Sequence, residues 1–91
     1  MSAAANLPGS ELIERGLADL GRGEETVESL LAAIGAHRLE ALGYTLARDI
    51  SSPEHRLFHL LAAEEPDAAH SRYNALIRRL VSFERAAECA S

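Results

Sequence analysis

The stretch SRYNALIRRLVSFERA, residues 71–86, decides the fold class of this chain. Its central apolar residues recur at the spacing of one face of an α-helix. Upstream, Glu65-Pro66 marks a boundary, because the residue before a proline avoids the α-helical region. The pattern therefore predicts one long helix over residues 67–89, which at about 1.5 Å per residue spans about 35 Å. The residues of the central stripe are Tyr73, Leu76, Ile77 and Leu80.

The expected length and breadth of this helix predict self-association. Helices of about 12 residues, expected elsewhere, span only about 18 Å, so the long helix would extend beyond the bundle unless it bends or packs against two layers. Val81 and Phe83 flank the stripe on opposite sides, which widens the apolar arc beyond the roughly 100° of a one-sided surface helix. Because symmetric dimers are the commonest closed oligomers, we expect a homodimer; the alternative is a monomer in which this helix is central. The expected interaction surface consists of Tyr73, Leu76, Arg79, Leu80 and Phe83.

Composition supports an all-α fold for the whole chain. Alanine and leucine, both strong helix formers, dominate the apolar residues, whereas aromatic residues make up only 4% of the chain. No stretch alternates apolar and polar residues in the manner of a strand. A length of 91 residues suits one domain. We expect a small compact bundle of about four to five helices over residues 9–91, preceded by a flexible N-terminal arm over residues 1–8.

Three further helices are expected before the long one. Ser10 is placed to cap the first, and acidic residues at Glu24 and Glu25 start the second. Gly35 either breaks this second helix or is absorbed into it. Ser52-Pro53 starts the third, with the serine hydroxyl as the cap and the proline in the first turn. The expected ranges are 10–21, 24–42 and 53–65.

The apolar face of each expected helix predicts the core. In the second helix this face has the spacing i, i+3, i+4, i+7. The connection over residues 44–51 is expected to tuck Leu46 and Ile50 under the bundle. The expected core includes Leu17, Leu20, Leu30, Leu31, Ile34, Leu57, Leu61, Tyr73, Leu76, Ile77 and Leu80.

Charge divides the chain into an acidic part and a basic end. The formal net charge is −5. Residues 10–65 hold five arginines and eleven acids, a net of −6, whereas residues 66–91 hold four arginines and three acids, a net of +1. This balance argues against nucleic acid as a partner. Arg78, Ser82 and Arg85 line one stripe of the last helix, which is either a basic strip for an acidic partner or a solvated face.

Features that would direct the chain to a membrane or out of the cell are missing from the sequence. The stretch MSAAANLPGS has neither the basic nor the apolar region of a signal peptide. No apolar run approaches membrane-spanning length. Cys89 is the single cysteine, so no internal disulfide can form. We expect a cytoplasmic protein that does not bind membranes.

No pattern in the sequence indicates a catalytic or cofactor site. His55 and His59 are neighbours at i, i+4, but they fall opposite the apolar face of their helix, and two imidazoles supply half of a zinc site. Arg56 stands where the H-E-x-x-H metalloprotease motif has its glutamate. No glycine-rich phosphate loop and no G-x-S-x-G elbow occurs. We therefore expect no enzyme, no cofactor and no metal; a metal protein using His55 and His59 is the weakest alternative.

The segment ETVESLLAAIGAHRLEALG, residues 25–43, has the outline of a helix-turn-helix. Its second helix, however, would offer only His37, Arg38 and Glu40 to a major groove. The surrounding negative charge would also repel phosphates. We expect instead a non-catalytic helical interaction module that self-associates or binds another protein chain, and a DNA-binding regulator using the segment around Gly35 is the alternative.

Overall fold

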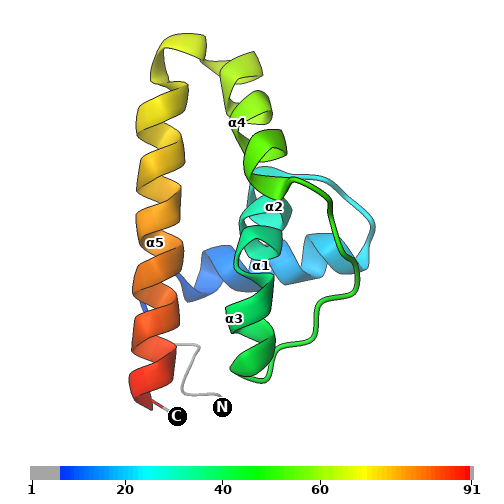
Figure 1. Cartoon of the computed structure of the whole chain (residues 1–91), viewed down its shortest axis with the longest axis vertical. Coiled ribbons are helices and arrows are strands. Elements are labelled where there is room, and N and C mark those ends of the chain that lie inside the picture. Colours follow the sequence, from blue (N-terminus) through cyan, green and yellow to red (C-terminus); the bar gives the residue numbers. More distant parts are fainter. Residues whose placement is uncertain (1–6, 91) are drawn as a thin grey trace.

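The computed structural model describes residues 7–90, and within that range the chain is helical apart from its connections (Figure 1). Five α-helices and one 3₁₀ turn are present, and the described residues contain no strand. The expectation of a small all-α bundle with a long C-terminal helix is confirmed. The elements are α1 (Ser10–Gly21), α2 (Val27–Ile34), α3 (Ala36–Ala41), α4 (Pro53–Glu64), η2 (Pro66–Ala68) and α5 (Ala69–Ala90).

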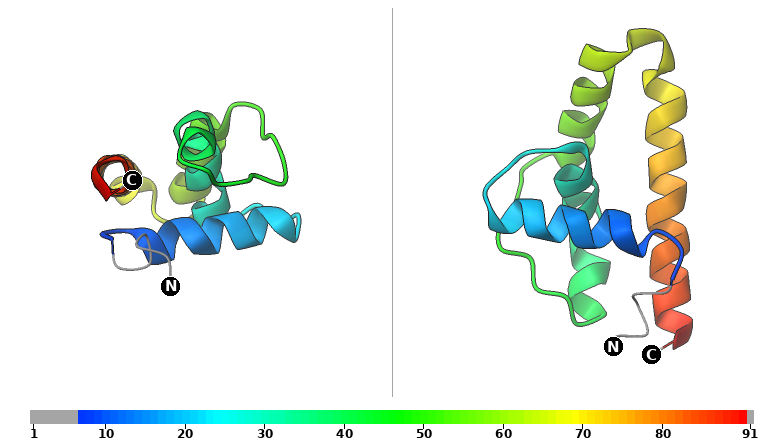
Figure 2. Two further views of the ribbon diagram at one scale, coloured as in Figure 1. Left: turned by 90° about the horizontal axis from the view of Figure 1, so that it is seen from below. Right: turned by 180° about the vertical axis from the view of Figure 1, so that it is seen from behind.

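The helices α4, α2 and α3 form a column beside α5, and α1 crosses this column (Figure 1, Figure 2). α4 and α5 form an antiparallel hairpin through η2, while α2 and α3 follow one another in nearly the same direction (Figure 1, Figure 2). α5 has 22 residues, a length of about 33 Å, and the molecule measures 38 Å along its longest axis. Of the alternatives that the sequence left open for so long a helix, the structure has packing against two successive helices, because α5 contacts both α4 and α2 (Figure 1).

Gly35 separates α2 from α3 without reversing the chain. Its N–H donates to the carbonyl of Leu31 at 3.3 Å, and its own carbonyl accepts from the N–H of Leu39 at 2.9 Å. These are helical i to i−4 bonds, so α3 continues the direction of α2 after a one-residue interruption. A Cβ atom at Gly35 would stand 2.9 Å from side-chain atoms of Leu80 and of Glu84. The glycine therefore allows α5 to approach this junction closely.

A capping box starts α2 two or three residues later than the acidic pair had indicated. The Thr26 hydroxyl accepts from the N–H of Ser29 at 3.1 Å, and the Ser29 hydroxyl accepts from the N–H of Thr26 at 2.7 Å. The Thr26 hydroxyl also donates to the buried Asp19 carboxylate at 2.7 Å, and Arg22 pairs with the same carboxylate. This network joins the end of α1 to the start of α2, so residues 24–26 form the connection instead of a helical turn.

The caps of two other helices are made by the backbone and not by serine hydroxyls. Gly9, at φ 79°, precedes α1, so Ser10 is its first residue and not its cap. Ser52 precedes α4 at φ 49° and its side chain makes no capping bond, although Pro53 lies in the first turn as expected. Leu7, within the segment expected to be a flexible arm, packs against the core, and its carbonyl accepts from the N–H of Ser10 at 3.1 Å. The rest of that arm, residues 1–6, lies outside the described residues.

The core contains most of the expected leucines and several residues that were not in the expected core. The expected members Leu17, Ile34, Tyr73, Leu76 and Ile77 are half-buried at its edge. The additional buried residues are Ile13, Ala32, Leu39, Ala69, Phe83 and Ala87. The expected members that are fully confirmed as buried are Leu20, Leu30, Leu31, Leu57, Leu61 and Leu80.

None of the helices within residues 7–90 combines the length and apolar character that are needed to cross a bilayer.

Gly16 is the point at which α1 crosses α2 most closely. A Cβ atom there would stand 2.2 Å from the carbonyl oxygen of Glu28, a backbone atom that cannot rotate away. Gly21, the last residue of α1, has nothing within 4 Å of its Cβ position. The two glycines therefore form a matched pair for testing this crossing.

We expect Gly16→Ala to lower the free energy of unfolding by about 1–3 kcal/mol, because the added methyl group overpacks the crossing. Gly21→Ala should leave stability unchanged or raise it by about 0.4–1 kcal/mol, because alanine reduces the entropy of the unfolded chain. Urea denaturation followed by circular dichroism measures both values. Equal effects of the two substitutions would contradict the close crossing at Gly16.

Candidate interaction grooves beside the last helix

The five residues expected to form one interaction surface are divided by the structure. Leu80 is 3% exposed and Phe83 is 0% exposed, so neither lines a free surface, and this part of the expectation is corrected. Phe83 is covered because the chain before α1 passes over it, with the Gly9 Cβ position 3.6 Å from the Phe83 Cβ atom. The ring of Tyr44 lies 6.0 Å away, centroid to centroid. Both neighbours come from connections, which the periodicity of a helix does not reveal.

The other three expected residues lie on two flanks of α5. Leu76 and Arg79 line what we name the α1 groove, between α5 and the starts of α1 and α2. Tyr73 is on the opposite flank, where its ring lies 6.2 Å from that of Phe58. The complete lining of the α1 groove is Leu12, Val27, Glu28, Glu64, Arg72, Ala75, Leu76 and Arg79.

A second groove, which we name the α3 groove, runs between α5 and the junction of α2 with α3. Its walls carry three half-buried apolar side chains, Ile34, Ile77 and Val81, and its base is closed by Leu80 and Gly35. The rim is polar and mostly basic. The complete lining is Ile34, Gly35, His37, Arg38, Ile77, Leu80, Val81, Glu84 and Arg85.

Glu84 places a carboxylate in the α3 groove although the residue is only 4% exposed. One carboxylate oxygen stands 2.9 Å from the Cβ position of Gly35. Within residues 7–90 no hydrogen bond reaches this carboxylate, and Arg38 pairs instead with Glu88 at 3.7 Å. Burial raises the pKa of Glu84 above its ordinary value; the charge of Arg38 opposes this rise and that of Glu88 adds to it.

Two arginines at and beside the α3 groove, Arg78 and Arg85, differ from Arg72 on the same helix in having no acidic partner within residues 7–90. Arg72 reaches Glu64 at 3.2 Å and Glu65 at 3.3 Å. Arg78 and Arg85, by contrast, are exposed and form no ion pair with the residues that the structure describes. They are seven residues apart, which places them on one side of α5. This side therefore carries uncompensated positive charge in a chain whose net charge is −5.

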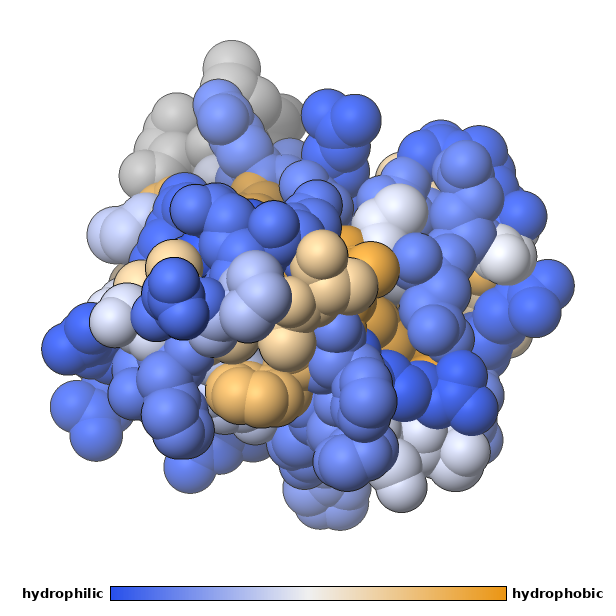
Figure 3. Space-filling model, turned by 90° about the horizontal axis from the view of Figure 1, so that it is seen from above, coloured by the Kyte–Doolittle hydropathy of each residue, from blue (hydrophilic) through white to orange (hydrophobic). Residues whose placement is uncertain are grey.

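The surface is hydrophilic at the end of the molecule where α4 meets α5. In the view from that end, apolar side chains gather near the middle and in a hollow, and hydrophilic side chains surround them (Figure 3). No broad apolar face is visible from this side (Figure 3).

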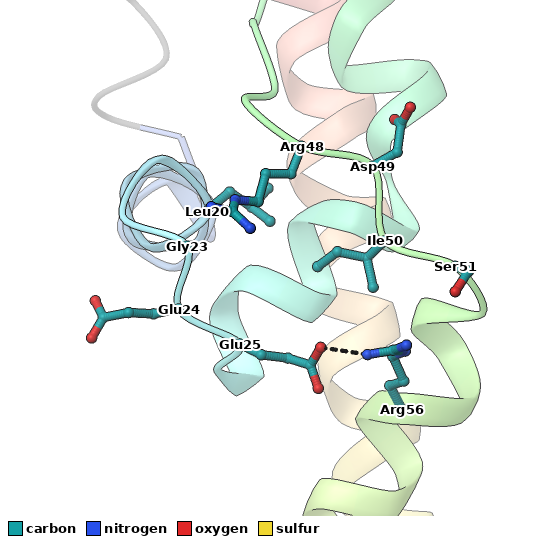
Figure 4. Close-up of a pocket in the computed structure, with 9 residues that line it drawn as sticks. All are labelled: Leu20, Gly23, Glu24, Glu25, Arg48, Asp49, Ile50, Ser51 and Arg56. Atoms are coloured by element: carbon teal, nitrogen blue, oxygen red, sulfur yellow. Dashed lines mark hydrogen bonds and ion pairs between the residues drawn. The ribbon is translucent and has the colours of Figure 1, made fainter.

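A further pocket lies between the α1–α2 connection and residues 48–51 (Figure 4). Two of its arginines lie against the α1–α2 connection: Arg56 of α4 reaches Glu25 at 2.7 Å, and the Arg48 guanidinium lies 2.6 Å from the Cβ position of Gly23. Gly23 has φ 74°, which only glycine adopts freely. These contacts tie the connection after α3 to the α1–α2 corner, and we assign the pocket a structural role.

The histidines do not form a metal centre with other side chains. The rings of His55 and His59 lie 4.8 Å apart, centroid to centroid, and both residues are exposed on α4. Within residues 7–90 no group of three or more potential metal ligands occurs. His70 instead lies against the ring of Phe58, with centroids 5.2 Å apart.

The geometry around Gly35 does not support a DNA-reading helix. A helix-turn-helix joins its two helices at about 90–120° through a three- or four-residue turn. Here α3 continues α2 in nearly the same direction after a single residue (Figure 2). Arg38, which would have read the groove of DNA, pairs with Glu88 of α5.

Comparison of the chain with models of protein families, with curated proteins and with solved structures finds no match to any of them.

We expect Glu84→Gln to raise the free energy of unfolding at neutral pH, because the neutral amide avoids burial of a charge. A pKa raised by folding means that Glu84 costs no stability at low pH, and that the cost appears as pH rises through its folded pKa. The extra stability of the variant should therefore shrink as pH falls from about 7 toward about 4, which is close to the ordinary pKa of a glutamate. Denaturation curves of both proteins across this range measure it, with Glu40→Gln as the control for loss of an exposed charge. A difference that grows toward low pH would contradict the burial of Glu84.

Proposed function

We propose that this protein is a non-catalytic helical interaction module that binds another protein chain in the α3 groove. The observation that carries the proposal is the coincidence, in one groove, of three half-buried apolar side chains with the carboxylate of Glu84, a residue that is only 4% exposed. When a partner covers half-buried apolar residues, the loss of their contact with water favours binding. A carboxylate that is largely shielded from water is stabilised when a partner donates a hydrogen bond to it.

The shape of the groove favours a helix as the bound element. It is lined by α5 on one side and by α2 and α3 on the other, and these helices run nearly parallel to one another (Figure 1). Recognition of an amphipathic helix in such a channel uses apolar side chains spaced one turn apart. Ile77 and Val81 have this i, i+4 spacing on α5.

A homodimer built on α5, expected from the sequence, is the weaker form of this proposal. Two of its supports are weakened, because Phe83 is buried and α5 packs against two successive helices, α4 and α2, of its own chain. A symmetric contact of α5 with α5 would also bring Arg78 and Arg85 of both copies together, and like charges in contact are unfavourable. We therefore favour a different chain as the partner, and we place the interaction in the cytoplasm because Cys89, the single cysteine, is an exposed thiol.

Site-specific photo-crosslinking in the native cell tests the proposal. With a photoreactive amino acid in place of Val81, within the groove, we expect adducts of defined mass. The same amino acid in place of Ala63, exposed on α4, should give none. An adduct of twice the 9.8 kDa chain mass identifies a second copy, and another mass identifies a different chain. Absence of adducts at Val81, or equal adducts at both positions, would refute the groove as a binding surface.

A further inference from the structure

We infer that the partner segment for the α3 groove is an acidic amphipathic helix, with an apolar stripe that covers Ile77 and Val81 and acidic residues seven apart that face Arg78 and Arg85. This inference rests on the proposed function and adds the chemistry of the partner. It follows from the arrangement of apolar, basic and acidic groups around the groove.

The apolar contacts fix the orientation of the bound helix. Ile34 lies on one wall of the groove, and Ile77 and Val81 lie on the other, so an apolar stripe inserted between them contacts both. Leu80 is buried below, which closes the groove beneath the inserted side chains. The bound helix then lies alongside α5. One side next to its apolar stripe faces α5, and its other sides face solvent.

The basic groups determine the charge of that helix. Arg85 lines the groove, and Arg78 lines an adjoining hollow with Ile77. Neither arginine is paired within the described residues, whereas Arg56 and Arg72 are each paired with acids of this chain. Seven residues along α5 correspond to about 10.5 Å, so acids seven apart on a parallel or antiparallel helix can face both arginines.

Neither α1 nor α4 of a second copy of this chain provides such a helix. The acidic residues of α1, Glu11 and Glu14, lie opposite an apolar face that is already buried against α2. The same is true of α4, whose Leu57 and Leu61 are fully buried. Neither helix can present a free apolar stripe without leaving its own core.

Glu84 limits where the acids of the partner can lie. Its carboxylate is in the groove beside Gly35, so an acid placed over it would be repelled, whereas an acid near Arg85 would not. The partner helix therefore carries its acids on the α5 side of its apolar stripe and a hydrogen-bond donor, or no polar group, over Glu84. A helix that is acidic on all sides does not fit.

Binding of designed helical peptides to the full chain tests the inference. One peptide has an apolar stripe flanked by glutamates seven apart; the second has lysines at these positions, and the third has the glutamates moved to the far side. We expect the first to bind at least about tenfold more tightly than the other two by fluorescence anisotropy, with affinity that falls as salt is raised. Arg85→Glu should weaken binding of the first peptide and strengthen binding of the lysine peptide. Arg15→Glu, the same charge change on the exposed side of α1, should do neither.

The outcomes separate this inference from the proposed function. If the lysine peptide binds as well as the glutamate peptide, and Val81→Asn weakens both, the acidic partner is refuted while the groove remains a binding surface. The acidic partner is also refuted if a single-stranded 20-mer DNA binds more tightly than the glutamate peptide and this DNA binding is lost in Arg85→Glu. If no peptide binds and Val81 gives no adducts in the cell, both are refuted. Circular dichroism of each variant shows that the fold is retained.

Discussion

The crossing of α1 over α2 at Gly16 is the contact on which the rest of the structure depends. The backbone of α1 approaches the Glu28 carbonyl so closely that no side chain can stand between them. This approach brings Ile13 and Leu20 of α1 against the buried leucines of α2. Asp19 then fixes the corner, because it accepts hydrogen bonds from Thr26 and Arg22 while nearly buried. With the corner fixed, α2 is held in place as the central element against which α4 and α5 pack.

Helices whose limits are set by local chemistry could be predicted from the sequence, whereas limits set by tertiary contacts could not. Pro53 and Pro66 mark the start of α4 and its end because proline acts through its own backbone geometry. The start of α2 depends on Thr26, whose hydroxyl is held partly by Asp19, seven residues earlier. The serine at the third position of that helix completes the capping box in place of the usual glutamate or glutamine, so the common motif was not visible.

The candidate site was predicted only in part, because connections and buried charge are invisible to helical periodicity. Phe83 resembles an exposed flank on a helical wheel, yet Tyr44 and the turn at Gly9 cover it. Glu84 resembles a solvated residue because acids usually are. A usable signal existed: Glu84 lies four residues after Leu80 and seven after Ile77, which places it next to the core stripe. A charged residue in such a position is a candidate for a functional group.

The groove and the fold share one cause in Gly35. Without a side chain there, α5 can pack against the α2–α3 junction, and Glu84 is drawn into the space that a Cβ atom would otherwise occupy. The fold therefore shields most of Glu84 from water, and this burial raises the pKa of its carboxyl. Such a group lowers stability unless something outside the fold compensates for it. Nothing in the packing of α5 requires an acid at this position, since an apolar residue could fill the same space. Contact with another chain would explain why an acid stands at position 84, which the packing of the fold alone does not explain.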